Sequence, residues 1–291
     1  MTENLTTIIS SASQSVEISR ENPTVIIGER INPTGRKKVL AALQEGNFDV
    51  VKSDAIKQVE AGAAILDVNA GVPGADEPVL LKKVMQTVMD VTDVPLCIDT
   101  ADPEALRAAL EIYDGKALIN STNGEEKSLE AILPLVKEFK TAVIGLCMDD
   151  DGIPPTPQDR LAVAEKIISR ADKLGIPMED VIIDPLALTM GSDHNAGRIA
   201  LETVELVVEK FGVNVTMGAS NISFGLPDRA YINSTYIAMA IYAGLTCPIT
   251  NPLITEIQTA VLAADLSMGR DEYGTRWIKA YRERQKKEAE A

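Results

Sequence analysis

The sequence predicts a (β/α)8 TIM barrel that forms a single domain over residues 1–291. Eight short runs rich in Val, Ile and Leu recur along the chain, and each is followed by a polar or glycine-rich break and a helical pattern. This alternation, in a chain of this length, is typical of a closed parallel barrel. An open doubly wound sheet is the alternative, but it would more naturally carry a GxGxxG turn after the first strand, and none is present there.

The eight predicted strands lack a clean apolar and polar alternation, as expected for strands that are buried on both faces of a parallel sheet. In chain order they span residues 24–31, 64–71, 95–100, 116–122, 142–148, 180–186, 215–222 and 247–252. Between them, Asp102 is a predicted N-cap with Pro103 at the first helical position. Thr156 begins another helix in the same way, and Gly175 is predicted to end it. A polar N-terminal extension (about 1–22) and a charged C-terminal helix (about 272–291) flank the barrel.

Composition and charge exclude several classes of protein. The chain is 45% hydrophobic and 24% charged, as in ordinary globular proteins, and no apolar run approaches the roughly 18 residues of a membrane span. No secretory signal is recognisable, so we expect a cytoplasmic protein. A formal net charge of −15 argues against a nucleic-acid partner. Cys97, Cys147 and Cys247 are predicted to be buried free thiols, and the single histidine, His194, is placed in a loop.

Polar residues gather where the predicted strands end, which is the end of a barrel that carries active sites. They are Glu29, Arg30, Asn32, Asp67, Asn69, Asp99, Asn120, Ser121, Asp184, Ser220, Asn221 and Asn251. Any one of them could cap a helix or close a loop. Because they occur together on so many strand ends, we interpret the set as a binding site.

The residue types in this set indicate a flat heterocyclic ligand. A carboxylate accepts two parallel N–H bonds, so Asp99 and Asp184 suit a guanidine-like edge, with about 1.5–3 kcal/mol for each charge-assisted bond. Asn120 and Asn221 can each donate and accept. A pterin ring meets these requirements. Because the acids lie one to a strand with amides between them, no metal site is predicted.

Six motifs in order, IIGERINPTG, AILDVNAG, PLCIDT, ALINSTN, VIIDPL and MGASNIS, resemble those of the pterin-binding methyltransferases. This family includes the methyltetrahydrofolate:corrinoid protein methyltransferases and the folate module of cobalamin-dependent methionine synthase. The resemblance covers about residues 24–270. It implies a dihydropteroate-synthase-like barrel, usually a homodimer, that binds tetrahydrofolate or 5-methyltetrahydrofolate. It also implies a corrinoid protein as partner, whose cobalamin gives or takes the methyl group.

The resemblance also assigns roles to single residues. Asp99, Asn120 and Asp184 match the positions that hydrogen-bond the pterin, and Asn221 matches the catalytic asparagine at the nitrogen that bears the methyl group. Further matches to the cavity are Glu29, Asn32, Asp67, Asn69 and Arg229. Gly218 and Ser220, just before Asn221, are predicted site residues because their small size leaves room for a flat ring. Phe224 stands where enzymes acting on a corrinoid/iron–sulfur protein have a glutamine.

The predicted reaction moves a methyl group between methylcob(III)alamin and tetrahydrofolate. An asparagine amide is too weak an acid to protonate the folate nitrogen, so Asn221 is expected to act by orientation and hydrogen bonding. The N-terminal extension and Phe224 favour the demethylation direction, in which the methyl group ends on tetrahydrofolate. Dihydropteroate synthase and a non-catalytic folate-binding subunit are the alternatives. The first would need basic residues at the ends of the late strands.

Overall fold

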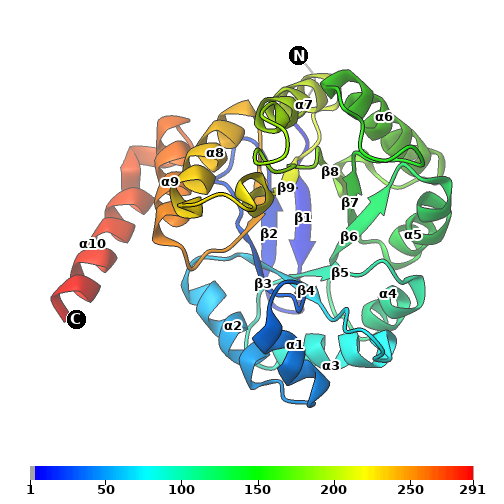
Figure 1. The fold of residues 1–291 in the computed structure, drawn as a ribbon, viewed down its shortest axis with the longest axis horizontal. Helices are drawn as coiled ribbons and strands as arrows, with labels where there is room; N and C mark the ends of the chain where they lie inside the picture. Colours follow the sequence, from blue (N-terminus) through cyan, green and yellow to red (C-terminus); the bar gives the residue numbers. More distant parts are fainter. Residues whose placement is uncertain (1–3, 291) are drawn as a thin grey trace.

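The computed structural model describes residues 4–290 and contains a barrel of eight parallel strands. These strands are β3 (Ile27–Ile31), β4 (Ile65–Asn69), β5 (Leu96–Asp99), β6 (Leu118–Asn123), β7 (Ala142–Leu146), β8 (Val181–Asp184), β9 (Thr216–Gly218) and β10 (Cys247–Thr250). Neighbours in chain order are paired, and β10 returns to β3. A parallel bridge between Ile183 and Val215 joins β8 to β9 and closes the ring. The predicted (β/α)8 barrel is confirmed (Figure 1).

Helices surround the ring of strands, as Figure 1 shows. They are α1 (Lys37–Gln44), α2 (Asp49–Glu60), α3 (Glu77–Met89), α4 (Pro103–Leu110), α5 (Glu126–Phe139), α6 (Pro157–Lys173), α7 (Ala196–Phe211), α8 (Arg229–Ala243), α9 (Thr255–Ser267) and α10 (Thr275–Glu290), with 3-10 turns η1 (Met178–Asp180), η2 (Ala219–Ser223) and η3 (Glu272–Gly274). Over residues 4–290, no helix is both long and apolar enough to cross a membrane. The charged C-terminal segment forms α10, which projects from the side of the barrel.

The helix termini form as the sequence predicts. The Asp102 side chain accepts a hydrogen bond from the Glu104 backbone N–H at 2.9 Å, which caps α4. Thr156 caps α6 through the Asp159 N–H at 3.2 Å. Gly175 follows the end of α6 with a φ of +77°, a left-handed conformation that glycine adopts without steric cost. These caps fix where α4 and α6 begin and where α6 ends.

Two hydrophobic cores stabilise the barrel. The larger one lies between the outer face of the strands and the helices. The smaller one fills the barrel interior and includes Ile27, Ile65, Cys97, Leu118, Ala142, Ile144, Ile182, Cys247 and Ile249. The three cysteines are buried and free, as predicted. Because the interior is filled with side chains, the barrel is a packed core and not a pore.

A β-hairpin occupies part of the segment that the sequence presents as a polar N-terminal extension. Its antiparallel strands are β1 (Thr7–Ser10) and β2 (Ser15–Ile18), and Ile9 and Ile18 are fully buried in the interior core. The Ser10 N–H donates to the Lys116 carbonyl just before β6, and Asn214, just before β9, donates to the Ile18 carbonyl. The hairpin therefore closes the end of the barrel where the strands begin, across the middle of the ring in Figure 1.

Candidate active site

Polar side chains at the carboxyl ends of the strands surround a cavity of about 380 Å³. The predicted site residues that line it are Glu29, Asn32, Asp67, Asp99, Asn120, Asp184, Gly218, Ser220 and Asn221. Four predicted site residues do not line the cavity: Asn69 and Arg229, which support its wall, and Ser121 and Asn251. The cavity forms because every strand of a parallel barrel ends on the same face.

Carboxylates and carboxamides are paired on the cavity floor. Asn120 Nδ2 donates to Asp67 Oδ1 at 3.1 Å, and Asn32 Nδ2 lies 3.4 Å from Asp99 Oδ2. Asn69, behind them, donates to the Asp99 backbone carbonyl at 3.1 Å. Burial raises the pKa values of both Asp67 and Asp99, and these two acids interact electrostatically. Burial thus disfavours the charged form of both acids, and a ligand that offers N–H donors would favour it again.

Asp184 forms the opposite wall, at the end of β8. Its Oδ1 accepts the Leu186 backbone N–H at 2.7 Å. Burial raises the pKa of Asp184 to about 6, while hydrogen bonds from the Leu186 and Gly218 backbone act in the opposite direction. Leu186 has a φ of +65°, a strained conformation for a leucine. The Asp184 carboxyl group is thus held in a fixed orientation with limited access to water.

Arg160 of α6 holds the loop that follows Asp184, and the sequence analysis assigned it no role. It is only 2% exposed, and its guanidinium donates to the carbonyls of Pro154, Pro185 and Leu186 at 2.8–2.9 Å. An arginine on a helix is usually solvated, so its position in the sequence gave no signal for this contact. Arg160 satisfies the carbonyls of the strained turn and keeps Asp184 in place.

A hydrogen bond connects Glu29 to Ser220, the residue that precedes the catalytic candidate Asn221. Ser220 Oγ donates to Glu29 Oε1 at 2.9 Å. Arg229, at the start of α8, donates to the Ser220 carbonyl at 2.6 Å and to Ser223 Oγ at 2.9 Å. Burial raises the pKa of Glu29, against smaller opposing effects from Ser220, Arg30 and Arg229. Arg229 thus positions the Ser220–Asn221 turn and does not line the cavity.

Asn221 lies on the 3-10 turn η2 and not on a strand. The predicted strand over 215–222 is wrong beyond Gly218, because β9 has only three residues. The Asn221 side chain is exposed at the cavity, and its carboxamide makes no hydrogen bond to any residue between 4 and 290. A Cβ at Gly218 would lie 2.9 Å from Asn221 Nδ2. Gly218 therefore makes room for this amide, which remains free to meet a ligand.

Two arginines, Arg30 within β3 and Arg36 in the loop after it, also line the cavity. Arg30 was one of the predicted polar strand ends, whereas Arg36 was not predicted. Arg36 is paired with Asp54 at 2.5 Å and also donates to the Arg30 carbonyl. Arg30 lines the cavity beside it, with its Nε buried. The site therefore combines an acidic floor with a basic rim on the β3 side.

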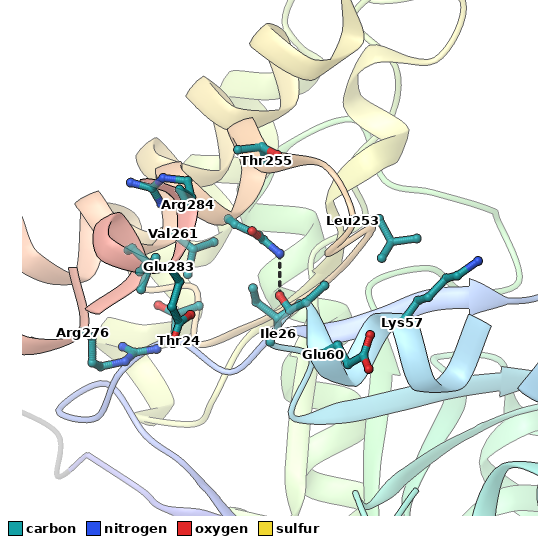
Figure 2. A pocket seen from close by; sticks show the side chains of 15 residues that line it. Thr24, Ile26, Lys57, Glu60, Leu253, Thr255, Val261, Arg276, Glu283 and Arg284 are labelled. Carbon is teal, nitrogen blue, oxygen red and sulfur yellow. Dashed lines mark hydrogen bonds between the residues drawn. The ribbon is translucent and has the colours of Figure 1, made fainter. Parts of the chain in front are cut away.

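A second and larger cavity, of about 480 Å³, lies outside the barrel between α2, α9 and α10. Figure 2 shows side chains of both charges around it, including Lys57, Glu60, Arg276 and Glu283. Gln258 crosses it and donates to the Ala61 carbonyl at 2.6 Å. Since none of the predicted site residues reaches this groove, the strand-end cavity is the candidate active site.

Comparison with known proteins identifies the family of the chain. A family model described as "Pterin binding enzyme" matches residues 28–251. Methylcorrinoid:tetrahydrofolate methyltransferase of Eubacterium limosum is 29% identical over 89% of this chain and 96% of its own length. Methionine synthase of Mycobacterium tuberculosis is 28% identical over 84% of this chain, which covers only 22% of that larger enzyme.

Solved structures share the fold at low sequence identity. Dihydropteroate synthase of Thermus thermophilus superposes with a TM-score of 0.68 at 19% identity, over 89% of this chain and 99% of that one. The enzyme of Xanthomonas albilineans, in complex with 7,8-dihydropteroate, gives 0.65 at 20% identity, over 89% and 98%. At these identities the likeness concerns the barrel alone.

Proposed function

The chain belongs to the family of pterin binding enzymes, and from this premise we propose that it transfers a methyl group between tetrahydrofolate and a corrinoid carried by a partner protein. The observation that carries the proposal is the cavity itself, in which carboxylates and carboxamides from separate strand ends face one another. The name of the Eubacterium limosum relative supports this reaction and the direction from methylcorrinoid to tetrahydrofolate.

The floor residues would hold the pterin ring. The Leu186 and Gly218 backbone groups hold the Asp184 carboxylate, and its remaining acceptor sites would meet the ring amino group. Asp67, Asp99 and Asn120 would meet the remaining ring donors and acceptors from the other side. Since the pKa of Asp184 is about 6, this group is ionised at neutral pH and accepts such donors as a charged group.

Methyl transfer to tetrahydrofolate needs a proton acceptor as well as an oriented nucleophile. As the bond from the folate nitrogen to the methyl carbon forms, the methyl–cobalt bond breaks, and the cobalt keeps the electron pair. The nitrogen becomes cationic and must then lose its proton. Asn221 would orient the nitrogen, and Glu29, whose pKa is raised by burial, would accept the proton. In the reverse reaction the same carboxyl group would return it.

Anaerobic mixing of the purified chain with methylcob(III)alamin and tetrahydrofolate tests this function. The expected result is formation of cob(I)alamin, followed by absorbance, together with an equal amount of 5-methyltetrahydrofolate. If tetrahydrofolate binds but no cob(I)alamin forms, the chain is a folate-binding subunit. If p-aminobenzoate condenses with a pterin pyrophosphate instead, it is a dihydropteroate synthase, although the ends of β9 and β10 carry no basic residue for that chemistry.

A homodimer is part of the same proposal. An apolar groove between α7 and α8 is lined by Met190, Leu201, Ile232, Tyr236 and Met239, among others, and Met239 is 51% exposed. Exposed apolar patches of this kind mark interaction surfaces. Light scattering of the chain, with Met239→Glu as the variant, tests it. A monomeric wild-type chain would contradict the proposal.

A further inference from the structure

Arg30 brings to the cavity a cation whose side-chain donors are unmatched. Its buried Nε has no hydrogen-bond acceptor, and none of its side-chain donors is bonded to a residue between 4 and 290. Only its backbone is bonded: the N–H donates to Gln58 at 2.8 Å, and the carbonyl accepts from Arg36. The neighbouring Arg36 differs, since Asp54 already neutralises it. Unmatched donors in a partly buried site cost free energy unless a ligand meets them. Burial and the charge of Arg36 lower the pKa of Arg30, and the smaller opposing effects of Asp54 and Glu29 come without a hydrogen bond to its side-chain donors.

A shift in strand register directs Arg30 toward the cavity. Gly28 pairs with Leu66 and Ile31 with Val68, so that both Glu29 and Arg30 lie opposite Asp67 alone. An extra residue of this kind re-aims the side chains beside it. Arg30 therefore lines the cavity together with Glu29, although neighbouring residues on a regular strand would face opposite sides.

We propose that Arg30 binds the carboxylates of the glutamate moiety of tetrahydrofolate, an inference that rests on the proposed function. The pterin ring carries no anionic group, and the floor meets it with acids. The folate nitrogen that Asn221 would orient adjoins the carbon that bears the aminobenzoyl-glutamate tail. The glutamate lies at the far end of that tail, beyond the whole aminobenzoyl group, so its carboxylates would lie at the rim of the cavity and not beside Asn221. Arg30 lines the cavity on the β3 side, where such a tail can leave it. A guanidinium offers the planar fork that binds a carboxylate with two hydrogen bonds.

Paired binding measurements test this assignment. Anaerobic titrations would compare tetrahydrofolate with tetrahydropteroate, which lacks the glutamate, on the wild-type chain and on Arg30→Gln. We expect the wild type to prefer tetrahydrofolate by about 10-fold or more, and Arg30→Gln to lose this preference while binding tetrahydropteroate normally. Arg30→Lys keeps the charge without the fork and should fall between them. Lys38→Gln, an exposed α1 residue outside the cavity, removes the same charge and should change nothing.

Two results would overturn the assignment. Equal affinity of the wild type for both compounds would mean that the glutamate is not recognised. An equal loss for both compounds in Arg30→Gln would mean that Arg30 only supports the cavity. Either result leaves pterin binding and the methyl-transfer proposal intact. Binding of neither compound to the wild type would refute the proposed function and this inference together.

Discussion

Replacing Gly218 by alanine should disable Asn221 without unfolding the barrel. The added Cβ would lie 2.9 Å from Asn221 Nδ2, whereas ordinary contacts begin at 3.4 Å, and apart from the Asn221 carboxamide no non-adjacent atom lies within 4 Å of it. Gly218 has φ −68° and ψ 75°, so alanine causes no backbone strain. The perturbation therefore acts on one amide group.

The expected size follows from this displacement. The carboxamide must move by about 0.5 Å or rotate away, and misplacement by 1 Å of a positioned group costs about 100-fold in rate. We expect single-turnover methyl transfer to fall by about 10- to 100-fold, with the dissociation constant for tetrahydrofolate changed by less than about threefold. The free energy of unfolding should change by no more than about 1 kcal/mol.

A double-mutant cycle decides whether Asn221 is the target. Asn221→Ala should by itself lower the single-turnover rate at least as much as Gly218→Ala. Once the amide is absent, Gly218→Ala should have no further effect on the rate. A full effect of Gly218→Ala in the Asn221→Ala background would refute the reasoning, since the new Cβ would then act on the ligand or on the backbone. So would an unchanged rate in Gly218→Ala alone.

Three further predictions concern the groups around Asn221. Glu29→Gln should slow methyl transfer to tetrahydrofolate and remove the acid limb of the pH–rate profile. In the wild type this limb should lie above the ordinary glutamate pKa of about 4.3, because burial raises the pKa of Glu29. An unchanged profile in the variant would exclude Glu29 as proton acceptor. The folded-state pKa of Asp184, about 6, exceeds its unfolded value of about 3.9, so protonated Asp184 stabilises the fold fully below pH 4, and this stabilisation is lost as the pH rises through 6. In urea unfolding, the free energy of unfolding of the wild type should therefore fall by about 2–3 kcal/mol more over this pH range than that of Asp184→Asn. The same pH dependence in both proteins would contradict this prediction. Arg160→Met should lower the free energy of unfolding by about 3 kcal/mol or more, because three carbonyls lose their hydrogen-bond donor. The control Arg198→Met, at an exposed position of α7, should lower it by less than about 1 kcal/mol. Equal losses of stability in thermal melts of the two variants would refute the role of Arg160.

The barrel and most of the cavity could be predicted because their signals are local. Runs such as VIID and ILDVN indicate strands buried on both faces, and the polar residues in the last part of each run must lie near the shared face of the barrel. Asp67, Asp99, Asn120 and Asp184 follow from that rule alone. The cavity confirms where these side chains lie, and their roles toward a ligand stay proposals.

The features that sequence reasoning missed depend on contacts between distant segments. The hairpin strands have four residues each, and Ile9 and Ile18 are buried only because the barrel lies against them. Asn221 follows a β-rich run, yet the chain turns into a 3-10 helix after three strand residues. Arg30 faces the cavity because of a register shift, which no pattern in one strand can reveal.

The N-terminal hairpin has a practical consequence for work on this protein. The family match begins at residue 28, and the polar composition before it invites trimming. A trimmed chain would expose the interior core at one end and admit water beneath the carboxyl groups whose pKa values depend on its exclusion. An affinity tag placed ahead of the intact hairpin, in contrast, sits at the end of the barrel away from the cavity. There it leaves the opening of the cavity clear for the corrinoid protein that we propose as partner.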